Sequence, residues 1–237
     1  MILFSDCLLC GSLVNVRNAT NNSQAPLICP DCHKRLPIVE SACDICAMPM
    51  TNPRINSSRF RCGECLTSSP PFEKTVSAFH YESPISDFIT ELKFHHQTQS
   101  LNLMSDYLSQ KITLAYKSDL LPHAILPIPL HHSRLKQRGF NQAQLIAAKL
   151  SKQLQIPLHR QGLDRQKATQ PQVGLDAAER AKNLKGAFRV RAIDASHVAL
   201  VDDVMTTGKT VTELTRCLLK AGIARVDVWT VARAYSY

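Results

Sequence analysis

The chain has 237 residues, of which 44% are hydrophobic and 20% charged, which excludes a disordered or fibrous protein and fits one globular domain with a small accessory unit. No stretch reaches the roughly 18 apolar residues that a membrane span requires, and the start, MILFSDCLLCG, lacks the basic and long apolar regions of a secretion signal, so we expect a cytoplasmic protein without membrane insertion. The formal net charge of +9 favours polyanionic partners, because Lys and Arg that neutralise phosphates release counterions.

Eight of the nine cysteines form four C-x-x-C pairs at the beginning of the chain. Such a turn presents two thiolates at one knuckle, and two knuckles complete a tetrahedral Zn²⁺ site. Two structural zinc sites are therefore expected, whose closed coordination excludes Lewis-acid catalysis. Pairing in chain order leaves 18 and 15 residues between knuckles, and an interleaved pairing stays open. The predicted ligands are Cys7, Cys10, Cys29, Cys32, Cys43, Cys46, Cys62 and Cys65.

A stretch rich in Ser and Pro, LTSSPPFEK, follows the last of these cysteines. Such a composition is typical of a linker. It divides the chain into a zinc-ribbon module, residues 1–68, and an α/β domain, residues 69–237.

Apolar periodicity predicts alternating strands and helices in the second domain. Strands alternating with helices indicate a mostly parallel sheet. The expected strands are 75–81, 124–130, 197–202 and 226–233, and the expected helices are 83–96, 101–116, 141–154 and 210–222, the last closed by Gly222.

Residues 131–140 are strongly basic and directly follow the apolar run 124–130. We expect a loop here, at the carboxyl end of a strand, where α/β sheets place ligand-binding loops. The candidate ligand contacts are Arg134, Lys136 and Arg138. The alternative interpretation is a solvated charge run.

The most specific motif is VALVDDVMTTGKT, residues 198–210. An apolar strand ends in Asp202 and Asp203, and a short Thr/Gly loop then opens into a helix. The loop amides, the threonine hydroxyls and the helix dipole suit a phosphate, and the two carboxylates suit a sugar diol or Mg²⁺. The motif is not a Walker loop, because no glycine lies five residues before Gly208. The alternative is that the acids only cap a helix.

This arrangement resembles the loop that binds phosphoribosyl pyrophosphate (PRPP) in type I phosphoribosyltransferases. The resemblance implies that Asp202 and Asp203, also the candidate catalytic residues, bind the ribose 2- and 3-hydroxyls. It also implies that PRPP arrives with Mg²⁺ and that a flexible loop covers the site. The residues implied to hold the 5-phosphate are Met205, Thr206, Thr207, Gly208, Lys209 and Thr210.

Two further segments and the cysteine knuckles narrow the resemblance. HHSRLKQRGFNQAQLIA (131–147), LDRQKATQPQVGLDAAERAKNLKGAFRV (163–190) and the knuckles CLLC, CPDC, CDIC and CGEC resemble the ComF family of competence-associated proteins over nearly the whole chain. That family joins a zinc module to a phosphoribosyltransferase-like domain. The resemblance implies that the basic segment contacts pyrophosphate and that residues 165–185 form the hood over the site; an ordinary exposed hairpin is the alternative for the hood.

Three functions follow from these observations. The first is a ComF-type protein that binds PRPP or a phosphosugar and handles single-stranded DNA during natural transformation, with competence-machinery proteins as further partners. The second is an active phosphoribosyltransferase acting on a nucleobase or other nitrogen acceptor, although no acceptor site can be identified in the sequence. The third is a regulator that senses PRPP.

Overall fold

The computed structural model describes residues 4–15, 28–50, 60–94, 99–166 and 186–235. Its centre is a four-stranded parallel sheet in the order β3-β8-β7-β4. The strands are β3 (Lys74–His80), β4 (Ala124–Pro127), β7 (His197–Met205) and β8 (Arg225–Arg233). All four expected strands therefore exist, and the predicted parallel α/β architecture is confirmed.

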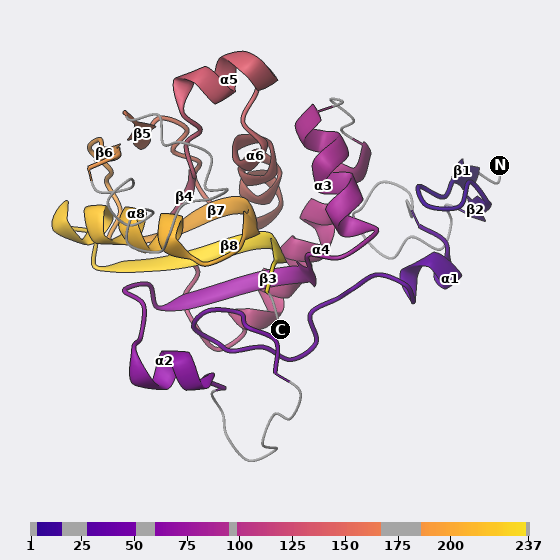
Figure 1. The fold of residues 1–237 in the computed structure, drawn as a ribbon, viewed down its shortest axis with the longest axis horizontal. Helices are drawn as coiled ribbons and strands as arrows, with labels where there is room; N and C mark the ends of the chain where they lie inside the picture. Colours follow the sequence, from indigo (N-terminus) through magenta and orange to yellow (C-terminus); the bar gives the residue numbers. More distant parts are fainter. Residues whose placement is uncertain (1–3, 16–27, 51–59, 95–98, 167–185, 236–237) are drawn as a thin grey trace.

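Helices cover both faces of this sheet (Figure 1). Alternate residues of a strand point to opposite faces, and on β7 Val201 packs in the cluster with α3, α4 and α6, whereas Leu200 packs in the cluster with α8. The helices are α3 (Ile85–Phe94), α4 (Gln99–Ala115), α6 (Gln142–Leu154) and α8 (Lys209–Lys220). Because both faces are covered, β8 is buried along nearly its whole length and shows no alternation of buried and exposed residues.

The ends of these helices lie within a few residues of those predicted from the sequence. Asn141 caps α6 with its side chain, whose Oδ1 accepts a hydrogen bond from the Ala143 amide at 3.0 Å, as residues of this type do. Beyond the end of α8, Gly222 has a φ of 96°, a conformation that glycine adopts without strain.

Three expectations about local structure were wrong, the first being the strand expected over 124–130, which ends at Pro127. The basic segment is not a loop but a short helix, α5 (His132–Arg138), which the His131 ring caps at its start and Gly139, with a φ of 77°, closes at its end. The strand expected over 197–202 runs on to Met205, because β8 continues to pair with it as far as the Met205–Arg233 pair. Pairing with β8 thus determines that β7 ends at Met205.

The cysteine-rich segment lies along the sheet and is not detached from it. It contains β1 (Phe4–Asp6), β2 (Leu13–Asn15), α1 (Pro30–His33) and α2 (Gly63–Thr67). Between its knuckles the chain runs past the outer edge of β3, where the Val39 amide donates to the Ala78 carbonyl at 3.0 Å and the His80 amide donates to Pro37 at 2.7 Å. These bonds satisfy edge groups that would otherwise be unpaired. We propose that the module ends near residue 68, where α2 has ended.

A small hairpin of β5 (Leu163–Arg165) and β6 (Phe188–Val190) follows α6 and flanks the main sheet. Leu163 and Phe188 of this hairpin belong to the same hydrophobic cluster as α8. Residues 167–185, most of the segment expected to form the hood, lie outside the described residues.

A buried polar network closes the amino end of the sheet. Asp227 has no exposed surface, and its Oδ2 accepts hydrogen bonds from Tyr116 Oη at 2.6 Å, His197 Nε2 at 2.7 Å and Arg225 Nη2 at 3.1 Å. Although burial alone would raise the pKa of the Asp227 carboxyl, these three donors hold it below its ordinary value. The buried charge is therefore compensated only while all its partners are present.

We predict that Asp227→Asn lowers the free energy of unfolding by about 3 kcal/mol, because it leaves the buried donors without a charged acceptor. Trp229, the chain's one tryptophan, is buried against Tyr116, so its fluorescence during urea denaturation reports on this region. Asp194→Asn, at an exposed carboxylate, is the matched control and should change stability by less than about 0.5 kcal/mol. Equal stability of the two variants would contradict the role of the network.

Candidate functional site

The eight knuckle cysteines gather into two groups in chain order. The first cysteine group is Cys7, Cys10, Cys29 and Cys32, and the second is Cys43, Cys46, Cys62 and Cys65; within each, the sulfur atoms all lie within 4.8 Å of one another. The chain therefore does not adopt the interleaved pairing of knuckles that the spacing had left open.

The geometry of both groups fits zinc. Four sulfurs at the usual Zn–S distance are about 3.8 Å apart in a tetrahedron, and the Sγ atoms of Cys10 and Cys29 are 3.7 Å apart, those of Cys46 and Cys62 3.6 Å. In the first group the Cys29 amide also donates to Cys7 Sγ at 3.3 Å, a bond that favours thiolate over thiol. Two structural Zn²⁺ sites therefore fit the fold.

The acid pair, Asp202 and Asp203, lies near the carboxyl end of β7 within the sheet. Asp202 Oδ1 accepts a hydrogen bond from the Asp203 amide at 2.9 Å, and Asp203 Oδ1 accepts one from the Val204 amide at 2.8 Å. Asp203 Oδ2 forms an ion pair of 2.7 Å with Lys93 Nζ at the end of α3. Both side chains of this ion pair are largely buried, with exposed fractions of 21% for Lys93 and 13% for Asp203.

The environment of Asp202 disfavours its ionised form. Burial is the largest cause, and the negative charge of Asp203 adds to it, so the pKa of the Asp202 carboxyl lies well above its ordinary value even though Lys93 acts in the opposite direction. Two adjacent carboxylates in a partly buried site create a demand for a cation or for hydroxyl donors. Neither acid caps α8, because both lie within β7 and the N-cap of α8 is Gly208, without a side-chain cap bond.

The Thr/Gly loop, residues 206–208, connects the end of β7 to α8. Thr206 and Thr207 are exposed, while Gly208 is buried, has a φ of 72° and precedes the first residue of the helix. A side chain at Gly208 would be strained by that φ, and its Cβ would lie 3.0 Å from Met205 Cε. The loop thus presents backbone amides and two hydroxyls at the positive end of a 12-residue helix, a favourable place for an anion.

Not every residue expected to hold the 5-phosphate offers its side chain to that loop. Met205 is 4% exposed and packs in the core under α8, so its backbone alone is available. Lys209 and Thr210 lie in the first turn of α8 and are partly buried.

The candidate residues of the basic segment lie on different faces of α5. Arg134 and Arg138 are four residues apart and share one face, where both are partly buried and Arg138 Nη1 donates to Gln142 Oε1 at 3.4 Å. Lys136 is exposed and lies on another face. The structure therefore separates Lys136 from the two arginines.

Arg165 links this helix electrostatically to the acid pair. It ends β5, and its guanidinium lies 5.5 Å above the Phe188 ring. Burial and the nearby positive charge of Arg134 lower the pKa of Arg165, while the negative charge of Asp202 raises it. Arg134 on α5 and Asp202 on β7 thus both act on the pKa of Arg165 at the end of β5.

Sequence reasoning missed two residues next to the motif. Lys93 is one of several charged residues on an amphipathic helix, and no local pattern distinguishes it. Arg233 ends the apolar strand VDVWTVAR, and it donates hydrogen bonds to the carbonyls of Met205 and Thr206. A charged residue at the end of a mostly apolar run was the signal that could have identified it.

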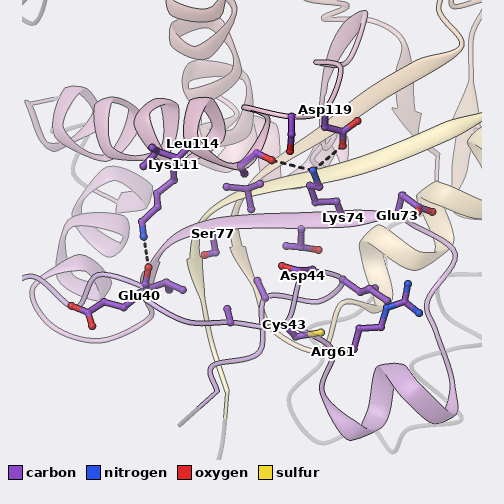
Figure 2. A pocket seen from close by; sticks show the side chains of 18 of the residues that line it. Glu40, Cys43, Asp44, Arg61, Glu73, Lys74, Ser77, Lys111, Leu114 and Asp119 are labelled. Atoms are coloured by element: carbon purple, nitrogen blue, oxygen red, sulfur yellow. Dashed lines mark hydrogen bonds and ion pairs between the residues drawn. The ribbon is translucent and has the colours of Figure 1, made fainter. Parts of the chain in front are cut away.

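A separate cavity of about 580 Å³ lies between the second cysteine group, β3 and α4 (Figure 2). No residue of β7, α5 or α8 is part of its lining. The lysines in its wall are already engaged: Lys74 pairs with Asp119 at 2.8 Å, and Lys111 donates to the Val39 carbonyl. This cavity is thus distinct from the acid pair and the Thr/Gly loop.

Comparison with known families finds two matches along the chain. A model described as a double zinc ribbon domain matches residues 1–66, and one described as a phosphoribosyl transferase domain matches residues 135–237. The predicted fold class, a phosphoribosyltransferase-like sheet domain preceded by a zinc-ribbon module, is confirmed.

Several relatives align with most of the chain. "DNA utilization protein YhgH" of Escherichia coli K12 is 34% identical over 209 residues, 87% of this chain and 90% of the relative. "Competence protein F" of Haemophilus influenzae is 39% identical over 179 residues, 73% of this chain and 78% of the relative. "Competence protein ComFC" of Bacillus subtilis is 26% identical over 216 residues, 87% and 84% of the two chains.

Among solved structures, Leishmania donovani UMP synthase aligns with 54% of this chain and 20% of its own length, at 19% identity and a TM-score of 0.30. That likeness is too low to support a conclusion. In the part of the chain that the structure describes, no helix has the length and apolarity needed to cross a membrane.

We predict that the protein contains two zinc ions per chain, one in each cysteine group, and that Cys10→Ser and Cys62→Ser each remove one of them, because three thiolates hold the ion much less tightly than four. Elemental analysis of the purified proteins measures the stoichiometry. Cys217→Ser, at the ninth cysteine, is the control and should retain both ions. Release of both ions by either knuckle substitution would show that the two groups are not independent sites.

Proposed function

Because this chain belongs to the ComF family of competence-associated proteins, we propose that it binds PRPP or a related phosphosugar and handles single-stranded DNA during natural transformation. The observation that carries the first half is the acid pair beside the Thr/Gly loop at the carboxyl end of β7. The second half is supported by the relatives whose names refer to competence and to DNA utilization.

The Thr/Gly loop would hold the 5-phosphate of the ligand. The exposed Thr206 and Thr207 offer hydroxyls, the loop offers amides, and Gly208 adopts the positive φ of the turn into α8. The positive end of α8 favours the anion further. Together these groups can replace the hydration shell of a phosphate. They would do so without the lysine that a Walker loop uses for this purpose.

The acid pair would accept hydrogen bonds from the ribose 2- and 3-hydroxyls. Burial and the repulsion from Asp203 raise the pKa of Asp202, and such hydroxyls or a cation would stabilise its ionised form. Carboxylate oxygens are preferred ligands of Mg²⁺, so the donor set fits the ion that accompanies PRPP. When bound, Mg²⁺ would neutralise charge on the pyrophosphate and on the acid pair.

The basic residues around the acid pair would receive the pyrophosphate. Burial and the positive charge of Arg134 lower the pKa of Arg165, and an anion near both guanidinium groups would offset their repulsion. Arg138 shares the face of Arg134 on α5. Lys136, on a different face, would then serve the phosphate backbone of DNA instead.

Binding of single-stranded DNA is supported by the formal net charge of +9 and by the two zinc ribbons. A basic surface neutralises the phosphate backbone and releases counterions. The phosphosugar site itself could receive the 5-phosphosugar of a DNA end. An active phosphoribosyltransferase is the alternative, distinguished by release of pyrophosphate when a nitrogen acceptor is added.

We predict that the zinc-loaded protein binds PRPP with Mg²⁺ in titration calorimetry and that the double variant Asp202→Asn, Asp203→Asn binds it at least about a hundredfold more weakly, because two charge-assisted hydrogen-bond acceptors are lost. Zinc content and Trp229 fluorescence should be unchanged. Asp194→Asn is the control. Unchanged PRPP affinity in the double variant would contradict the assignment of the acid pair to ribose binding.

The same titration with short single-stranded DNA present tests how the two ligands are related. PRPP affinity weakened by DNA would indicate one shared site and would support the DNA-handling role. Independent binding would favour a transferase or a sensor of PRPP, and lack of DNA binding at low salt would overturn the second half of the proposal.

A further prediction concerns the pH dependence of PRPP affinity. Ionised Asp202 is the form that accepts hydroxyls, so affinity should rise with pH through the pKa of Asp202 and then level off. Lys93 lowers that pKa, so Lys93→Met should move the midpoint to higher pH. Calorimetry across a pH series measures it, with Lys152→Met on the exposed face of α6 as control.

Titration of PRPP itself affects the wild type and both variants equally, so the difference between their midpoints reports on the protein alone. A midpoint that Lys93→Met leaves in place would mean that the ion pair with Asp203 has no influence on the acid pair during binding.

A further inference from the structure

Arg233 is a buried arginine at the point where three parts of the protein meet. It is the last residue of β8, 4% exposed, and its backbone pairs with His80 on β3 and with Met205 on β7. Desolvating a guanidinium is costly unless hydrogen bonds compensate it. The hydrogen-bond partners of Arg233 therefore indicate the role of this buried guanidinium.

The side chain of Arg233 binds backbone carbonyls on two sides. On one side Nη1 donates to Met205 at 3.2 Å, to Thr206 and to Ala234. On the other side Nε donates to the carbonyl of Cys46 at 2.9 Å. One guanidinium thus joins the entry of the Thr/Gly loop to a zinc knuckle 187 residues away in the sequence.

The bonds on the loop side determine the direction of the loop amides. In a planar trans peptide the N–H points opposite to the C=O. Holding the carbonyls of Met205 and Thr206 against Arg233 therefore turns the amides of Thr206 and Thr207 away from Arg233. These amides belong to the loop that would hold the phosphate, where donor direction decides affinity.

The bond on the other side depends on the shape of the second cysteine group. Cys46 is a predicted zinc ligand, and its knuckle is tight: the Ala47 amide donates to the Cys43 carbonyl at 2.8 Å, and Ala47 has a φ of 53°. Coordination fixes such a turn, which has little apolar core of its own. Loss of the metal would remove that restraint and leave the position of the Cys46 carbonyl to the backbone hydrogen bonds of the knuckle alone.

Charge supports the same link. Zn²⁺ with four thiolates carries a formal charge of about −2, which suits a buried guanidinium bonded to one of its ligand residues. The Thr75 amide also donates to the Asp44 carbonyl at 3.1 Å and holds this knuckle against β3. The first cysteine group packs instead in the hydrophobic cluster with α3 and α4.

We propose that Arg233 is a positioning residue that couples metal occupancy of the second cysteine group to the geometry of the Thr/Gly loop. The phosphosugar site then reaches its full affinity only when the second group holds zinc, whereas the first group has no such influence. This inference takes the identity of the ligand from the proposed function, but the coupling itself is a property of the free protein.

The test compares the two cysteine groups in the full chain. Hydrogen exchange of the segment 203–210 and calorimetric affinity for PRPP with Mg²⁺ are measured for wild type, Cys62→Ser and Cys10→Ser. Cys62→Ser should accelerate exchange in the segment and weaken PRPP binding about tenfold, as expected for one charge-assisted hydrogen bond lost. Cys10→Ser, which empties the first group, should leave exchange in the segment unchanged.

Arg233→Lys separates the link from the metal. Lysine retains the charge but cannot bond to both sides at once, so this variant should keep two zinc ions and still show fast exchange and weak binding. Adding Cys62→Ser to it should cause little further change, because the shared connection is already broken.

Two results would overturn the proposal: exchange of the segment 203–210 that Cys62→Ser does not alter, or an equal effect of Cys10→Ser. If Arg233→Lys fails to fold, as judged by Trp229 fluorescence, the comparison of the two cysteine variants decides alone. Exchange that responds to the second group in a protein that binds no PRPP would refute the proposed ligand and support the coupling.

Discussion

The parallel pairing of β7 with β8 is the constraint on which the rest of the molecule depends. It runs from His197–Arg225 at one end to Met205–Arg233 at the other, and helices bury both faces. At its amino end the pairing brings His197 to Asp227, and at its carboxyl end it carries the acid pair to the edge of the sheet and places Arg233 beside the loop. Because both strands are buried, neither can shift by one residue without exchanging its two faces.

The acid pair shows how a stable sheet can hold an unfavourable charge arrangement. Asp202 and Asp203 repel each other where burial already disfavours ionisation, and Lys93 offsets only part of that cost through its 2.7 Å ion pair with Asp203. Strand pairing keeps the carboxylates in place despite this repulsion, and the proposed ligand, with its hydroxyls and cation, would reduce it. Sites of this kind are common where a protein binds charged substrates.

The zinc-ribbon module lacks a large apolar core. A cysteine-rich segment with few large apolar side chains cannot bury enough surface to fold by itself, and coordination replaces that missing core. Here the cysteine-rich segment also packs against the main domain. The chain between the knuckles hydrogen-bonds to the edge of β3, and the two cysteine groups belong to different hydrophobic clusters of the sheet, so metal binding and the packing of the sheet support each other.

The sequence by itself determined what depends on neighbours along the chain. C-x-x-C spacing identified the zinc knuckles, 3.6-residue periodicity identified the helices, and the apolar run before Asp202 located the strand and its motif, because each pattern expresses the geometry of a single element. Only the tertiary structure decided the chain-order grouping of the cysteines, the extension of β7 to Met205, and the meeting of Lys93 with Asp203 and of Arg233 with Cys46. Those contacts join segments up to 187 residues apart, and which of many similar lysines and arginines makes them depends on how elements pack in space, which no local pattern encodes.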